Sequence, residues 1–356
     1  MSRLDGIRKI KKIDRSDMLG VLESFPGQCE NARIIGIMFV PPVSYKTGYS
    51  NIIFTGMGGS AISAEILRSY IWREAKIPVF VNRGYRMPGF TGRGSLVVVI
   101  SYSGDTEETV NAYIDARSRH AKIIVVTSGG RLRALAEKDS VPVIELPRGL
   151  QPRCAVGYLF FPILKALSKI GISSDRSRDV REAIKTLEAL RRKRIGSAVP
   201  ESKNIAKRIA LKLHGRFPVI YGSSDSTDCI VTRWRGELAE NAKQLSSGHL
   251  FPEMNHNEIV GWENPPKVLK DFIAVFLRDV DDHPRVSKRV DITAKMLKKS
   301  GFETIEVRSF GKTRLARLFS FLYIGDFVSF YLAILNGTDP TPVGRIAYLK
   351  NELGRG

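Results

Sequence analysis

The sequence has little cysteine. Only Cys29, Cys154 and Cys229 occur in 356 residues, and they lie far apart in the chain. None of them has a second thiol or a histidine at the spacing of a metal-ligand pair. The sequence therefore argues against a disulfide framework and against a zinc site, and we expect no bound metal.

Long uninterrupted apolar runs are also missing. The first 17 residues contain six Lys and Arg but no apolar run that could be the core of a signal peptide. The longest apolar stretch, residues 318–335, is interrupted by Gly325 and Asp326, so we expect a buried or subunit-facing helix there rather than a membrane span. These features predict a cytoplasmic protein with no membrane partner.

Negative charge is scarce, since 36 Asp and Glu stand against 56 Lys and Arg and leave a formal net charge of +20. Such a charge attracts both small anions and nucleic acid. The basic residues are nevertheless scattered along the chain, and no zinc finger, RNA-binding aromatic motif or basic zipper is present. We interpret the charge as favouring solubility and the steering of an anionic substrate, and we expect no nucleic-acid partner.

Residues 51–146 alternate between short apolar runs and helix-like segments. Runs typical of strands occupy residues 51–56, 78–81, 96–100, 122–127 and 141–146. Helical patterns occupy residues 60–73, 106–117 and 132–138. Because almost every residue of these strands is apolar, we expect a parallel sheet with helices on both faces.

A second alternation begins near residue 213. Its expected strands are residues 217–221, 272–277 and 304–307, and its expected helices are residues 227–243, 284–299 and 314–335. The length and apolar content of the chain allow two sizeable cores. We therefore predict an α/β fold with two domains, residues 1–172 and 213–356, joined by a charged helical linker at residues 173–212.

Two loops follow predicted strands and precede predicted helices, where an open parallel sheet binds its ligands. The first, GMGGSA at residues 56–61, has glycines that let the backbone approach an anion. The second, SYSGDT at residues 101–106, offers three Ser and Thr hydroxyls. Because both loops are expected at one edge of the sheet, they predict a phosphate site formed by Gly58, Gly59, Ser60, Ser101, Ser103 and Thr106. For either loop alone, an equally good interpretation is that Ser60 and Thr106 cap helices and the glycines only turn the chain.

The first loop also satisfies the pattern G-x-G-x-x-A of dinucleotide-binding proteins. That pattern needs an acidic residue at the end of the next strand to hold a ribose. The next strand here ends in Asn82 and Arg83, of which only Arg83 could meet the 2′-phosphate of NADP. A nicotinamide-dependent dehydrogenase is therefore the weaker alternative.

Two motifs in the second half give the chain a more specific resemblance. They are RWRGELAENAK at residues 233–243 and FPEMNHNEIVGW at residues 251–262. Together with the two loops, which resemble the phosphate-binding segments of the sugar isomerase (SIS) domain, they make the chain similar to the bifunctional phosphoglucose/phosphomannose isomerases of archaea. The resemblance covers nearly the whole chain. It implies two doubly wound, flavodoxin-like SIS domains and a homodimer whose site lies between domains and subunits.

The resemblance also implies an aldose-ketose isomerase that interconverts glucose 6-phosphate or mannose 6-phosphate with fructose 6-phosphate, without a cofactor. Glu240 matches the base that moves a proton between C1 and C2. His256 matches a histidine that reaches in from the neighbouring subunit and helps to open the sugar ring. Arg153 matches an arginine that faces the enediolate, and Lys350 is the best match for a lysine near the ring oxygen.

The expected chemistry suits these residue types, because a carboxylate is ionised at neutral pH and can take a proton from carbon and return it to the neighbouring carbon. By spacing alone, however, Glu240 lies three residues after Glu237 and three before Lys243, a pattern more typical of a solvated surface pair. The SIS resemblance also leaves open a phosphosugar-sensing protein that binds its ligand without turnover.

Overall fold

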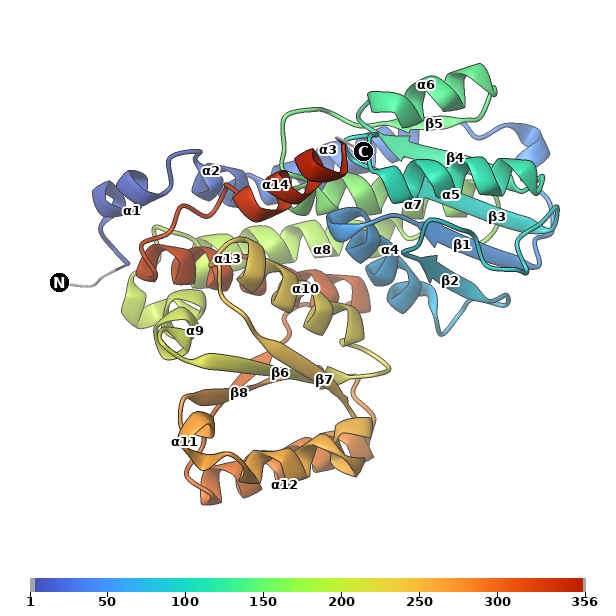
Figure 1. Cartoon of the computed structure of the whole chain (residues 1–356). Coiled ribbons are helices and arrows are strands. Elements are labelled where there is room, and N and C mark those ends of the chain that lie inside the picture. Colours follow the sequence, from blue (N-terminus) through green and yellow to red (C-terminus); the bar gives the residue numbers. More distant parts are fainter. Residues whose placement is uncertain (1–3, 355–356) are drawn as a thin grey trace. The chain divides into compact units, whose positions relative to one another are not determined.

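The computed structural model describes residues 4–354, which form two parallel sheets and the helices around them (Figure 1). These residues divide into two compact units, each assembled from separate stretches of chain. The five-stranded unit comprises residues Ser24–Leu187 and Phe310–Phe319. The four-stranded unit comprises the residues up to Glu23, residues Glu188–Ser309 and the residues from Ser320 onward.

The sheet of the five-stranded unit has the order β2-β1-β3-β4-β5, and all its neighbouring strands are parallel. Its strands are β1 (Asn51–Thr55), β2 (Val79–Asn82), β3 (Ser95–Ile100), β4 (Lys122–Thr127) and β5 (Val143–Glu145). Every residue of β1 and β3 is buried, as expected for central strands covered on both faces. The order 2-1-3-4-5 is that of flavodoxin-like doubly wound folds.

The helices of this unit cover the two faces of its sheet. They are α3 (Phe25–Met38), α4 (Gly58–Ile71), α5 (Glu107–Ser118), α6 (Gly130–Lys138) and α7 (Val156–Lys169), with short helices η1 (Val43–Tyr45) and η2 (Pro152–Cys154). Apolar side chains of α5 and α6 form one core with β3 and β4. On the other face, α4 contacts β1 and β2, and α7 packs against both α3 and α4.

The second sheet has the order β7-β6-β8-β9 and is also entirely parallel. Its strands are β6 (Phe217–Ser223), β7 (Ser247–Phe251), β8 (Phe272–Arg278) and β9 (Glu303–Arg308). The unit's longer helices are α1 (Ile7–Ile13), α2 (Met18–Glu23), α9 (Ile205–Leu213), α10 (Asp228–Glu240), α12 (Pro284–Lys299) and α14 (Gly344–Leu353). Its short helices are η3 (Arg191–Ile195), η4 (Glu201–Lys203), η5 (Glu253–His256), η6 (Glu258–Glu263) and α11 (Pro266–Leu269).

The prediction of two doubly wound parallel sheets is confirmed. The units, however, do not divide at residues 172 and 212. The division runs through α8 (Ser177–Leu190) and α13 (Arg314–Leu335), and it groups the first helices with the second half of the chain. The contacts behind this grouping join distant residues, such as the bond of 2.7 Å from the Tyr323 hydroxyl to the Leu22 carbonyl. Local patterns do not reveal such contacts.

One described helix, α13, is long and apolar enough to cross a membrane by length and composition. In the structure, 94% of its apolar window is buried inside the protein. The helix therefore serves as a core element, as the interruption at Gly325 and Asp326 predicted.

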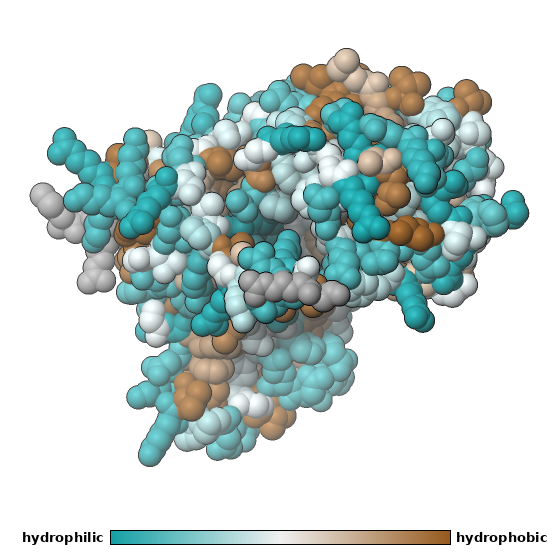
Figure 2. All heavy atoms as spheres, turned by 45° about the horizontal axis from the view of Figure 1, so that its top comes forward, coloured by the Kyte–Doolittle hydropathy of each residue, from teal (hydrophilic) through white to brown (hydrophobic). Residues whose placement is uncertain are grey.

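Much of the positive charge lies at the surface. On α1, Arg8, Lys9, Lys11 and Lys12 are exposed, whereas Ile10 is buried. Figure 2 shows hydrophilic side chains gathered at the left of the view, over this helix. The charge of this helix thus faces solvent.

Candidate active site

The five-stranded unit has a topological switch point between β1 and β3. The chain leaves β1 toward β2 on one side and continues from β3 toward β4 on the other, so the loops after β1 and β3 diverge. In open α/β sheets this divergence opens the ligand-binding crevice. Both predicted phosphate loops lie here, at the carboxyl ends of these two neighbouring strands.

The glycine loop makes room for the backbone of η2. A Cβ atom on Gly59 would lie 2.6 Å from the Pro152 carbonyl oxygen and 2.9 Å from the Arg153 nitrogen, closer than side chains approach. Gly58 begins α4 with φ +49°, a conformation that favours glycine. This close packing places Arg153, which is 3% exposed, beside the first loop.

The hydroxyls of the two loops are already bonded to each other and to the backbone. Ser60 accepts a bond of 3.3 Å from the Tyr102 N–H, which joins the first loop to the second. Ser101 donates to Thr106 over 3.1 Å and accepts from the Gly104 N–H at the same distance. The exposed Ser103 hydroxyl accepts from the Asp105 N–H.

The capping interpretation is wrong for Ser60 and is confirmed for Thr106 by position only. Ser60 lies within the first turn of α4, whose N-cap is Met57. Thr106 does hold the N-cap position of α5, but its side chain makes no capping bond. The structure instead brings the predicted phosphate-binding residues together with Arg153 at one edge of one sheet.

Sequence reasoning missed Tyr102 as a support of this edge. Its hydroxyl donates to the Pro147 carbonyl over 2.7 Å and accepts from the Leu150 N–H at 3.1 Å. Burial raises the pKa of this hydroxyl, so it remains protonated as a donor. Tyr102 thereby ties the second loop to the segment that leads into Arg153. A tyrosine between two serines in a loop has no sequence pattern that predicts hydrogen bonds to a segment more than 40 residues away.

In the four-stranded unit, Glu240 is the last residue of α10 and is half-buried. The helix ends three residues before the predicted end at residue 243, because Lys243 adopts φ +54°. Glu240 lines a cavity of ≈ 550 Å³ between the end of α10 and the start of α14. The other lining residues are Ala239, Lys243, Gln244, Leu245, Val343, Gly344, Arg345 and Ile346.

A buried network of charged and polar side chains precedes Glu240 on α10. The Arg233 guanidinium contacts the Glu237 carboxylate at 2.7 Å and the Asp326 carboxylate at 2.9 Å, and all three side chains are at most 5% exposed. The Asn241 amide donates to Glu237 over 2.7 Å and to Ser329 over 3.0 Å. Burial raises the pKa of Asp326, while Arg233 acts in the opposite direction. Glu237 is therefore buried and bonded to Arg233 and Asn241, so the solvated surface pairing that the spacing suggested does not include it.

His256 lies near the start of α10, whereas Glu240 lies at its end. It ends η5, which follows the carboxyl end of β7, and it is exposed. That end of β7 pairs with the end of β6, from which the chain enters α10. The 13 residues of α10 make a helix about 20 Å long. Within one chain, Glu240 and His256 are therefore separated by about the length of that helix.

Lys350 is exposed on α14, whose first turn lines the cavity beside Glu240. It lies four residues after Ile346, so the two side chains share one face of the helix. Arg153 and the phosphate loops belong to the five-stranded unit, whereas Glu240, His256 and Lys350 belong to the four-stranded unit.

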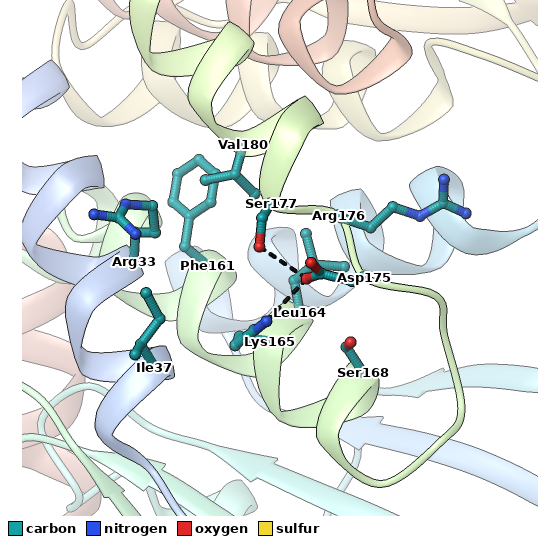
Figure 3. A pocket seen from close by; sticks show the side chains of 10 residues that line it. All are labelled: Arg33, Ile37, Phe161, Leu164, Lys165, Ser168, Asp175, Arg176, Ser177 and Val180. Atoms are coloured by element: carbon teal, nitrogen blue, oxygen red, sulfur yellow. Dashed lines mark hydrogen bonds and ion pairs between the residues drawn. The ribbon is translucent and has the colours of Figure 1, made fainter.

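A further cavity in the five-stranded unit is lined by side chains of α3, α7 and α8 (Figure 3). Its room of ≈ 20 Å³ suffices for about one water molecule. The Lys165 ammonium and the Ser177 hydroxyl both contact Asp175 there, at 2.9 Å and 2.8 Å. This cavity is too small for a sugar phosphate. Among residues 4–354, no group of three His, Cys, Asp or Glu could hold a metal ion.

Known proteins resemble both halves of the chain. Residues 202–353 match the family described as the bacterial phospho-glucose isomerase C-terminal SIS domain, and residues 48–138 match the SIS domain. The bifunctional phosphoglucose/phosphomannose isomerase of Caldicellulosiruptor bescii is 47% identical over 85% of this chain and 89% of its own. The protein of the same name from Thermoplasma volcanium, an archaeon, is 37% identical over 87% of this chain and 94% of its own. This chain belongs to the bifunctional phosphoglucose/phosphomannose isomerase family.

Membership in this family confirms the resemblance inferred from the motifs and makes the chain an enzyme. A solved structure supports the fold independently. The glucose-6-phosphate isomerase like protein from Thermus thermophilus matches with a TM-score of 0.63 and 20% identity over 99% of both chains. The roles of Glu240, His256, Arg153 and Lys350 stay predictions.

Proposed function

We propose that this protein interconverts glucose 6-phosphate and mannose 6-phosphate with fructose 6-phosphate through a cis-enediolate, with Glu240 as the base. The observation that carries the proposal is the position of Glu240. In a chain of this family, it lines a cavity of ≈ 550 Å³, which lies in the size range of small-molecule sites.

The isomerisation requires one base that removes the proton from C2 of the aldose and returns it to C1. The Glu240 carboxylate performs both transfers in the proposal, while a second proton moves between the two sugar oxygens. Such proton transfer contributes about 10²- to 10⁴-fold to the rate. The remaining acceleration comes from stabilising the negative charge of the enediolate. Arg153 is the cation proposed for this task, because it is buried beside the phosphate loops.

The remaining residues bind the phosphate of the substrate or act at its ring oxygen. Gly58, Gly59, Ser60, Ser101, Ser103 and Thr106 bind the phosphate, where the N-terminus of α4 contributes backbone N–H groups. His256 protonates the ring oxygen during ring opening, and Lys350 binds near that oxygen. Because α10 separates His256 from Glu240 within one chain, we propose that a homodimer brings His256 to the site of its partner. A phosphosugar substrate favours the cytoplasm as the location, and no cofactor is invoked.

The first test measures conversion of fructose 6-phosphate by purified protein after chelator treatment, without nicotinamide. We expect both glucose 6-phosphate and mannose 6-phosphate as products. The Glu240→Gln variant should lose activity by about 10²-fold or more, while its affinity for a phosphosugar, measured by calorimetry, stays within about threefold.

Glu306→Gln is the matched control, since it removes an exposed carboxylate from β9 in the same unit. It should retain full activity. Full activity of Glu240→Gln would remove Glu240 from the mechanism. Phosphosugar binding without any turnover by the wild-type protein would instead favour a sensing protein.

A further inference from the structure

Lys243 follows α10 in an unusual conformation. Its φ of +54° is one of four positive values among the described non-glycine residues. Non-glycine side chains rarely adopt this conformation, whereas glycine adopts it readily at the end of a helix. The lysine at this position is therefore notable for what its side chain contacts.

The Lys243 ammonium binds main-chain carbonyl oxygens from two distant segments. It donates to Glu240 over 2.7 Å, to Asp339 over 3.0 Å and to Pro340 over 3.2 Å. The first carbonyl belongs to the last residue of α10, where a cation is also favoured by the helix dipole. The other two lie far along the chain, just before α14. Lys243 therefore clamps residues 339–340 to the end of the helix that carries Glu240.

The clamped segment leads directly into the opposite wall of the cavity. The Asp339 carboxylate accepts a bond of 3.1 Å from the Thr341 N–H, and prolines at 340 and 342 restrict the backbone on both sides of Thr341. Val343 and Ile346 then line the cavity that Glu240 and Lys243 line from the other side. The clamp thus fixes the distance between the proposed base and this wall.

We propose that Lys243 is a positioning residue that sets the ratio of glucose 6-phosphate to mannose 6-phosphate formed from fructose 6-phosphate. The inference rests on the proposed function. The two products differ only in the configuration at C2, so their ratio depends on which face of the enediolate C2 meets the Glu240 carboxylate. A wall that is fixed relative to Glu240 restricts the rotation of C2, and a looser wall restricts it less.

The test compares Lys243→Met with the wild type at early times, before the products reach equilibrium. We expect the product ratio to change by about three- to tenfold toward the minor product of the wild type. Lys243→Arg keeps a cation that reaches the same carbonyls, and it should restore most of the wild-type ratio. In the structure the Asn336 amide also donates to the Ala242 carbonyl over 3.0 Å. Neither substitution removes that bond, so we expect the two segments to remain joined.

Lys169→Met is the matched control. The Lys169 ammonium also binds two main-chain carbonyls, those of Ile37 and Phe39, but in the five-stranded unit. Its loss should lower thermal stability without changing the product ratio. If Lys243→Met folds poorly, Lys243→Gly supplies the same readout, because glycine accepts the positive φ.

The outcomes separate the two proposals. An unchanged product ratio in an active Lys243→Met or Lys243→Gly variant would overturn the role of Lys243 and leave the isomerase intact. A lower kcat/KM with the wild-type ratio would overturn that role as well, since it indicates a purely structural contribution. If the wild type itself forms neither product, the proposed function fails and the role of Lys243 fails with it.

Discussion

At the residue scale, Arg233 holds two carboxylates that are buried with it on and beside α10. We expect Arg233→Met to lower the free energy of unfolding by about 3–5 kcal/mol, because it leaves Glu237 and Asp326 without their buried cation. Urea unfolding at neutral pH measures this change. The matched control is Arg308→Met, which removes an exposed pair with Glu306 and should cost at most about 1 kcal/mol.

The contribution of Asp326, in the same network, to the free energy of unfolding should depend on pH. Its raised pKa means that the folded protein retains a proton which the unfolded chain loses near the ordinary value of 3.8. The contribution of Asp326 to stability is therefore largest below that value and declines as the pH rises toward the folded-state pKa. Asp326→Asn cannot ionise, so its stability relative to the wild type should increase as the pH rises above about 4. A difference in unfolding free energy that stays constant from acidic to neutral pH would contradict the raised pKa.

At the scale of elements, the approach of η2 to α4 depends on one glycine. Gly59→Ala forces the Pro152–Arg153 backbone away, and we expect kcat/KM for fructose 6-phosphate to fall about 10- to 100-fold. The neighbouring Gly58→Ala is the control, since its Cβ would meet no atom within 4 Å, although its φ of +49° strains any side chain. Equal losses in both variants would show that backbone conformation matters here, rather than the approach of Arg153.

Local sequence patterns predict these elements unevenly. Apolar strands between turn residues identify β1, β3, β4, β6 and β8, and the bounds predicted for α12 and α13 coincide with those observed. The strand β7, with the sequence SGHLF, has neither alternation nor β-branched residues and escapes prediction. The end of α10 is also misplaced, because a lysine in the left-handed region has no signature in the sequence. The two proposed phosphate loops can be located because glycines and hydroxyls between a strand and a helix form a recognisable pattern.

At the scale of the whole molecule, the distance between Glu240 and His256 within one chain determines how a site can be built, and the sequence does not reveal it. Glu240 and His256 lie close together in the chain, yet the connection through β7 returns the chain to the opposite edge of the sheet. Two residues at opposite ends of α10 cannot both reach one sugar of six carbons. If both act in the reaction, each site must combine Glu240 of one subunit with His256 of another.

This arrangement predicts that two inactive variants complement each other. Glu240→Gln and His256→Ala should each lose activity as pure proteins. When the two are co-expressed, each mixed dimer contains one site with both residues intact and one site with neither. The mixed dimer, isolated by two affinity tags, should therefore recover about half of the wild-type kcat per dimer. If both parents are inactive, a mixed dimer as inactive as they are would mean that His256 serves its own chain, because a site shared between subunits cannot fail in this combination.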